Sequence, residues 1–214
     1  MIYNEHSNLR GKHALFSPSG YSWMNYDEDD AIRKYCASYA PSVGTVLHAY
    51  TEDCIRYGTK LGRYDKKHIL LELMRGGIPT AVIDRLPIDD IFENLVPYVN
   101  DGIGFRMTPE VPLYYSDLCF GHADALCYDE REKFLRIHDL KTGTTPAKID
   151  QLIAYDALFR LEYCPLLRVR PEEISSELRI YQNGEIVYCT PSSDDIITVM
   201  EQIKTLDKTV TYLQ

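Results

Sequence analysis

The chain has 214 residues, of which 45% are hydrophobic, and its 32 acidic and 23 basic side chains give a formal net charge of −9. This length and apolar content predict one domain with its own core and argue against a disordered chain. The most apolar segments are short and interrupted by charges, which argues against a membrane span. The acidic excess argues against tight DNA binding driven by charge alone, because such binding draws on lysine and arginine.

The first half of the chain is predicted to be helical. Ser17-Pro18-Ser19 and Asp89-Asp90 are typical of helix starts, and Gly76-Gly77 is typical of a helix end. The predicted helices are Gly20–Tyr26, Asp29–Tyr39, Ser42–Gly58, Asp65–Arg75 and Ile88–Asp101.

The second half alternates strands and helices. Asn183-Gly184 is the strongest hairpin signal in the chain. The predicted strands are Phe105–Tyr115, Phe120–Cys127, Phe134–Lys141, Glu177–Gln182 and Glu185–Cys189, and the predicted helices are Ala147–Tyr163 and Ser193–Leu206. The order predicts a single α/β domain: a mainly helical part (1–103), a catalytic sheet with its following helix (104–192) and a C-terminal helix (193–214).

Two acids and a lysine stand on the predicted hairpin of the second and third strands. Asp139 and Lys141 are two residues apart, so on a strand they share a face. If Cys127 pairs with Phe134, Asp124 lies diagonal to Asp139; a register with the two acids directly opposite works equally well. Carboxylate oxygens suit a hard divalent cation, and an ammonium group steadies charge developing on a phosphate.

The alternative is a solvated hairpin with an ordinary ion pair between Asp139 and Lys141. The neighbouring residues favour function instead. Asp139 lies in the apolar strand FLRIHDL, and Asp124 lies in the apolar run CFGHADALCY. Unpaired charge is costly in such half-buried strands, and a functional site explains why it is present.

These motifs together resemble the PD-(D/E)xK nuclease superfamily, and within it the RecB-like exonuclease branch that includes phage proteins and the CRISPR adaptation nucleases. The resemblance rests on GHAD, DLKTG and QLIAY, preceded by KHALFSPSGYSWMNY and GTVLHAYTE. In this order they span residues 12–155, about two thirds of the chain. The resemblance implies a restriction-endonuclease-like core with a small mixed sheet, flanking helices and an N-terminal helical cap.

The resemblance also implies roles for individual residues. Asp124 and Asp139 match the metal-binding acids and Lys141 the catalytic lysine, with the backbone carbonyl of Leu140 as a further metal ligand. His48 matches the histidine that supplements the metal site.

The helix after the catalytic strand carries the last motif. Gln151 and Tyr155 match residues that hold DNA and order the site. Glu52, four residues after His48, is a candidate to brace that histidine or the lysine. Glu110, on the strand before the hairpin, is a minor candidate for a further acid.

The implied cofactor is Mg²⁺ or Mn²⁺, which would activate a water molecule for attack on a phosphodiester. An imidazole ligand favours tolerance of Mn²⁺. Six scattered cysteines without a C-x-x-C group argue against an iron–sulfur cluster and, with no signal peptide, suit a reduced cytoplasmic compartment. Basic residues concentrate at 60–67 and 160–170; each stretch is either a DNA groove or a solvated face.

The function expected from this resemblance is that of a metal-dependent exonuclease acting on DNA, as duplex ends or single strands, in phage recombination or repair. A homo-oligomer or a recombination partner protein would help to retain the DNA. A structure-specific or nicking endonuclease is the alternative within the enzymes. From other classes, a catalytically silent DNA-binding or protein-docking module and a metal-binding domain unrelated to nucleic acid remain open. The complete Asp–Asp–Lys set argues against the catalytically silent module, because a scaffold has no need to keep all three residues.

Overall fold

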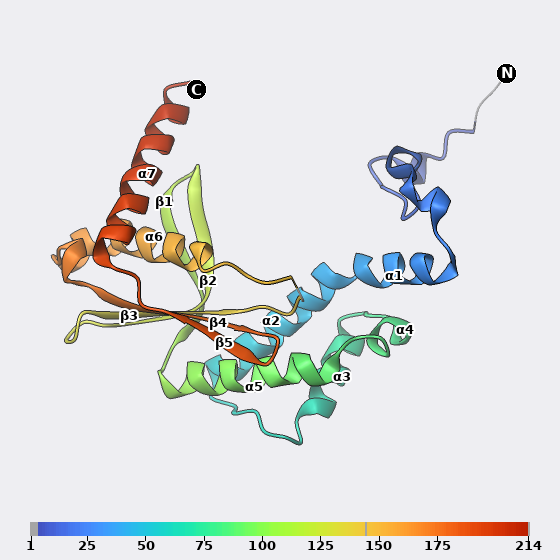
Figure 1. The fold of residues 1–214 in the computed structure, drawn as a ribbon, viewed down its shortest axis with the longest axis horizontal. Coiled ribbons are helices and arrows are strands. Elements are labelled where there is room, and N and C mark those ends of the chain that lie inside the picture. The colour runs from blue at the N-terminus through green and yellow to red at the C-terminus, as the bar shows by residue number, and fades with distance from the viewer. Residues whose placement is uncertain (1–3, 144, 214) are drawn as a thin grey trace.

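A five-stranded mixed sheet lies at the centre of the molecule in the computed structural model, which describes residues 4–143 and 145–213. The strands follow chain order across the sheet: β1 (Thr108–Ser116), β2 (Cys119–Asp129), β3 (Phe134–Leu140), β4 (Ser175–Gln182) and β5 (Glu185–Cys189). All neighbours are antiparallel except β3 and β4, which are parallel. The helix between β3 and β4 makes the crossover that a parallel pair requires (Figure 1).

Helices cover both faces of this sheet. One face packs against the N-terminal helices α2 (Ala40–Tyr57), α3 (Lys66–Arg75) and α5 (Ile88–Gly104), and the other against α6 (Asp150–Leu167). The helix α7 (Ser193–Thr211) packs on α6, and α4 (Thr80–Ile83) is a single short turn. The helix α1 (Glu28–Ser38) and the residues before it extend away from the sheet (Figure 1). Shorter 3₁₀ helices are Ser7–Leu9, Pro18–Asn25 and Pro171–Glu173.

The predicted α/β class with a mixed sheet is confirmed, and the predicted helices and strands lie within a few residues of those observed. The first predicted helix is a 3₁₀ helix, and α4 was not predicted. The N-terminal helices form a layer on the sheet, and only α1 with its preceding segment projects as a cap would. None of the helices in the described part of the chain combines the length and apolar character that crossing a bilayer requires.

Local chemistry fixes several of these element ends. Asp27 caps α1 by accepting a hydrogen bond from the backbone N–H of Asp30, and Ser192 caps α7 in the same way. The turn between β4 and β5 uses positive φ at both Asn183 and Gly184, as a type I′ turn needs.

The register between β2 and β3 decides between the two pairings that the sequence allowed. Cys127 pairs with Arg136 and not with Phe134, because the strands continue for two more pairs toward the turn. Continued the other way, this register puts Asp124 opposite Asp139 instead of diagonal to it. The observed pairing is thus the second of the two registers that the sequence allowed.

The strand β2 changes face at Asp124. Ala123 belongs to the core cluster against α6, whereas Ala125 belongs to the cluster against α2 and α5. Residues two apart on a regular strand share a face, so the alternation breaks between them. At the matching level of β1, Glu110 has a φ of 51°, in the left-handed region that non-glycine residues rarely adopt. Beyond this point the β1–β2 hairpin rises out of the sheet (Figure 1).

Candidate metal centre

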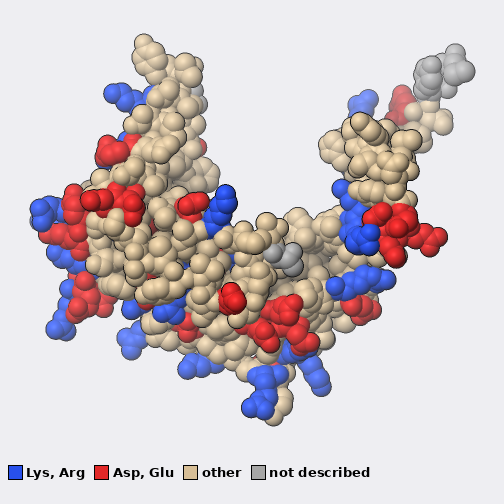
Figure 2. All heavy atoms as spheres, viewed as in Figure 1, with Lys and Arg blue, Asp and Glu red and all other residues tan. Residues whose placement is uncertain are grey.

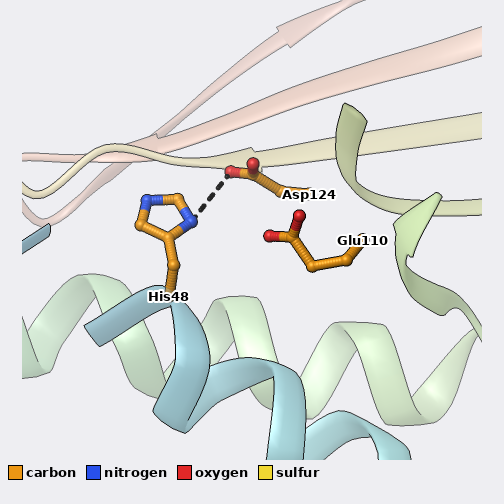
Figure 3. Close-up of side chains that lie close together, drawn as sticks. All are labelled: His48, Glu110 and Asp124. Atoms are coloured by element: carbon orange, nitrogen blue, oxygen red, sulfur yellow. Dashed lines mark ion pairs between the residues drawn. The ribbon is translucent and has the colours of Figure 1, made fainter. Parts of the chain in front are cut away.

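Three side chains from three separate elements converge where the β1–β2 hairpin leaves the sheet. His48 lies on α2, Glu110 on β1 and Asp124 on β2 (Figure 3). Each offers one ligand atom, and these atoms all lie within 4.8 Å of one another. His48 Nδ1 is 3.5 Å from Asp124 Oδ2. All three side chains are partly buried, so the group is not a fully solvated acidic surface.

Asp124 is anchored by the backbone of β3. The N–H of Leu140 donates a 2.9 Å hydrogen bond to Asp124 Oδ2, which leaves Oδ1 available for another partner. Burial nevertheless raises the pKa of Asp124 to about 6, against the opposing effects of that hydrogen bond and of Lys141. The carboxylate therefore lies in surroundings that do not compensate its charge.

Asp139 is buried even more deeply, with 1% of its surface exposed. Lys141 Nζ donates a 3.0 Å hydrogen bond to Oδ1. The same Nζ is 2.9 Å from Oδ2, but at an angle that gives no hydrogen bond, so Oδ2 has no hydrogen-bond partner among the described residues. Burial, and next the charge of Asp124, raise the pKa of Asp139 to about 6 despite Lys141.

Lys141 is held in turn by α6. Its Nζ donates to Gln151 Oε1 at 3.0 Å, and Gln151 Nε2 donates to the Tyr155 hydroxyl at 3.0 Å. Gly121 allows this arrangement, because a Cβ there would lie 2.9 Å from Tyr155 Cε1. The residues of the Q-x-x-x-Y motif thus form a chain that fixes the lysine beside Asp139.

The surroundings of His48 favour its neutral form. Burial lowers its pKa, and the nearby charges of Asp139 and Glu110 offset that effect only in part. The backbone of Leu140 is close enough to hydrogen-bond to the His48 ring, and this contact, like the charges of those acids, raises the pKa of His48. A neutral imidazole has a lone pair free for a metal ion.

This donor set fits a divalent cation. One imidazole and two carboxylates suit Mn²⁺ and related ions, and carboxylates alone suit Mg²⁺. Two neighbouring buried acids with raised pKa values have Lys141 as their nearest cation, so a bound cation would relieve their repulsion.

The structure brings His48, Asp124, Asp139 and Lys141 into one site. It also places Glu110, a minor candidate from the sequence, beside His48 and Asp124 as a third possible metal ligand. In the sequence, only its position in PEVPLYY, on the strand before the β2–β3 hairpin, indicated this role. Glu52 does not brace the site, because it pairs with Arg56 on the outer side of α2.

Two further residues were not expected from the sequence. Tyr98 on α5 is 2% exposed, and burial followed by the charges of Asp124, Asp139 and Glu110 raises its pKa well above the usual value. Nothing in the sequence distinguishes it among 17 tyrosines.

Gln182, at the end of β4, holds the loop that follows Lys141. Its Nε2 donates to the carbonyls of Gly143 and Thr145, and its Oε1 accepts from the N–H of Ala147. The N–H of Lys141 donates to the carbonyl of Tyr181 directly before it. These bonds place the start of α6, and with it Gln151, relative to the lysine.

One arginine of the second basic stretch, 160–170, has a structural role. Arg160 is 1% exposed and donates hydrogen bonds to Asp156, to Ser176 and to the carbonyl of Pro171, so it cannot line a DNA groove. The cysteines also lie outside the site: none belongs to the metal-ligand group found among the described residues.

Comparisons with protein-family models, with curated proteins and with solved structures find no match. The RecB-like resemblance of the motifs therefore stays a prediction, and the case for a function depends on the geometry of the site.

Proposed function

We propose that this protein is a metal-dependent nuclease that hydrolyses phosphodiester bonds of DNA, with a restriction-endonuclease-like core and a site of the RecB-like type. The observation that carries the proposal is a pair of neighbouring acids, the partly buried Asp124 and the buried Asp139. Both have their pKa raised to about 6, with a histidine and a glutamate on one side and a lysine on the other. Such uncompensated acid pairs are typical of functional sites.

His48, Glu110 and Asp124 would hold the cation, with Asp139 and the carbonyl of Leu140 as further candidate ligands. A bound Mg²⁺ or Mn²⁺ supplies Lewis acidity, which lowers the pKa of water and offsets charge on the phosphate.

The remaining residues would act on the substrate directly. Lys141 has its ammonium group fixed at two points, by Asp139 and by Gln151. It is therefore placed to donate to a phosphate oxygen as negative charge develops there. Tyr155 and Gln151 would line the approach of the DNA strand.

An exonuclease of phage recombination or repair is our first choice, and an endonuclease shares the same site chemistry. The first test compares end-labelled linear duplex with closed circular plasmid, in Mg²⁺, Mn²⁺ or EDTA. We expect loss of the linear DNA alone, with either metal and not in EDTA. Cleavage of the circle would identify an endonuclease.

Two variants test the named residues. Lys141→Ala and Asp139→Ala should lose cleavage while melting near the temperature of the parent protein, and Lys208→Ala, on the exposed surface of α7, is the matched control. Cleavage by pure Asp139→Ala at the parent rate would refute the site. Absence of cleavage by the folded parent protein with either metal would refute activity of the isolated chain and leave a binding module.

A further inference from the structure

The β1–β2 hairpin carries a row of exposed side chains that begins at the metal centre. In the observed register, three successive levels of the same face run from the sheet toward the hairpin tip. The levels are Glu110 with Asp124, then Pro112 with His122, then Tyr114 with Phe120.

The opposite face of the hairpin is already covered. Leu113 and Ala123 are fully buried in the cluster against α6, and Gly121 closely approaches Tyr155. Alternation along both strands therefore turns Tyr114 and Phe120 away from α6. The row is thus a separate surface, continuous with the metal centre at one end.

The side chains of this row are open to solvent. Tyr114 is 50% exposed and Phe120 is 60% exposed, and His122 is also exposed. Paired aromatic rings often stabilise a hairpin by packing on each other. Here neither Tyr114 nor Phe120 forms a ring pair with any described residue. The Tyr114 hydroxyl donates to Asp117 at 3.0 Å, which holds that ring in place.

The charge distribution indicates what kind of contact a nucleic acid would make here. On the face shown in Figure 2, lysines and arginines are interspersed with acids and form no continuous basic band. With a net charge of −9, phosphate neutralisation is a weak source of affinity for this protein. Stacking of bases on aromatic rings does not depend on net charge and tolerates any sequence.

We propose that this hairpin face binds a single strand of DNA and leads it to the metal centre, with bases stacked on Phe120, Tyr114 and His122. The inference rests on the proposed nuclease function and specifies its substrate as an unpaired strand at the site. Successive levels of the row are about 7 Å apart. Stacked bases of a duplex are separated by about 3.4 Å, so the row suits bases that are splayed from one another.

The test measures binding of a fluorescent oligothymidine by anisotropy in EDTA, where no cleavage intervenes. Phe120→Leu keeps an apolar side chain but removes the ring, and it should weaken binding by about 5- to 100-fold. Phe120→Trp should retain the parent affinity or exceed it. Tyr57→Leu, which alters a tyrosine that is 76% exposed on α2, is the matched control and should change nothing.

The slope of affinity against salt adds a second readout. Phe120→Leu should leave it unchanged, because no phosphate contact is lost. Parent affinity in Phe120→Leu would overturn the proposal, and so would equal losses in the leucine and tryptophan variants. A protein or a second copy of the chain on this face would produce the first of those results.

Hydrolysis of bis(p-nitrophenyl) phosphate with Mn²⁺ separates this inference from the nuclease proposal. The small ester needs no stacking surface, so Phe120→Leu should hydrolyse it at the parent rate. The parent protein could hydrolyse neither the small ester nor DNA, while Phe120→Leu still binds the strand more weakly than the parent does. In that case the nuclease proposal fails and the stacking face is supported. If the parent protein cleaves both the small ester and DNA, and Phe120→Leu binds the strand with the parent affinity, the nuclease proposal is supported and the stacking face is refuted.

Discussion

Asp124→Asn should stabilise the metal-free protein at alkaline pH. The pKa of Asp124 rises from 3.8 to about 6 on folding, chiefly through burial. At about 1.4 kcal/mol per pKa unit, keeping this group ionised in the fold costs about 3 kcal/mol. Asparagine removes the charge but keeps an oxygen that can accept from the N–H of Leu140. The upper limit of the gain is therefore about 3 kcal/mol, or about 6 to 12 °C in melting temperature for a domain of this size.

The sign of the pH dependence follows from linkage. Because the folded pKa is raised, the folded protein takes up a proton before the unfolded chain does as pH falls. The loss of folding stability caused by ionised Asp124 is therefore fully present above about pH 6 and disappears toward pH 4. Thermal unfolding in EDTA at pH 8 and at pH 4 measures both limits, with Asp53→Asn on the exposed side of α2 as the control. An Asp124→Asn protein destabilised equally at both pH values would refute the reasoning.

Three further predictions concern the same region and its supports. Affinity for Mn²⁺ should fall as pH drops through about 6, because Asp124 and Asp139 must lose their protons before a cation binds. Calorimetric titrations that give equal affinity at pH 5 and pH 8 would contradict this. Asp156→Asn should lower the free energy of unfolding by about 3 to 5 kcal/mol, since it leaves Arg160 buried and uncompensated; urea denaturation measures the loss, and a change under 1 kcal/mol would show that the pair is dispensable. Gln182→Ala should slow DNA cleavage and expose residues 142–143 and 145–149 to proteases, because three hydrogen bonds to that loop are lost. Unchanged protease resistance would show that other contacts hold the loop.

Local signals in the sequence account for most of the fold. Caps such as Asp27 and the Asn183-Gly184 turn act through neighbouring backbone groups, so they can be recognised without the tertiary structure. The register of β2 and β3 could not be chosen in advance, because the length of the strands beyond Cys127 decides it.

Some residues of the candidate site could likewise be expected from the sequence, whereas others depend on the tertiary structure. The acids and the lysine of the β2–β3 hairpin were expected to lie together because their spacing places them on one face. The roles of Gln151 and Tyr155 on α6 were suggested by the resemblance to a family, and the hydrogen bond from Lys141 to Gln151 joins two separate elements. The approach of His48 to Asp124 depends on how α2 packs on the sheet, and only the resemblance to a family suggested it. The inward position of Glu110 depends on a left-handed backbone that no propensity predicts for glutamate. Gln182 acts through the loop it binds, across 37 to 39 residues of sequence.

The parallel pairing of β3 and β4 also sets the order in which the protein can assemble. The strands β1, β2 and β3 are joined by short turns, so their contacts form at low entropic cost. The β3–β4 pairs join residues about 40 apart, and contacts of such sequence separation form slowly. Lys141 is held by Tyr181 and Gln151, both of which reach it only after the crossover helix has docked. Until then the edge of β3 is open to pairing with other chains, and the nascent protein is at its most prone to aggregate.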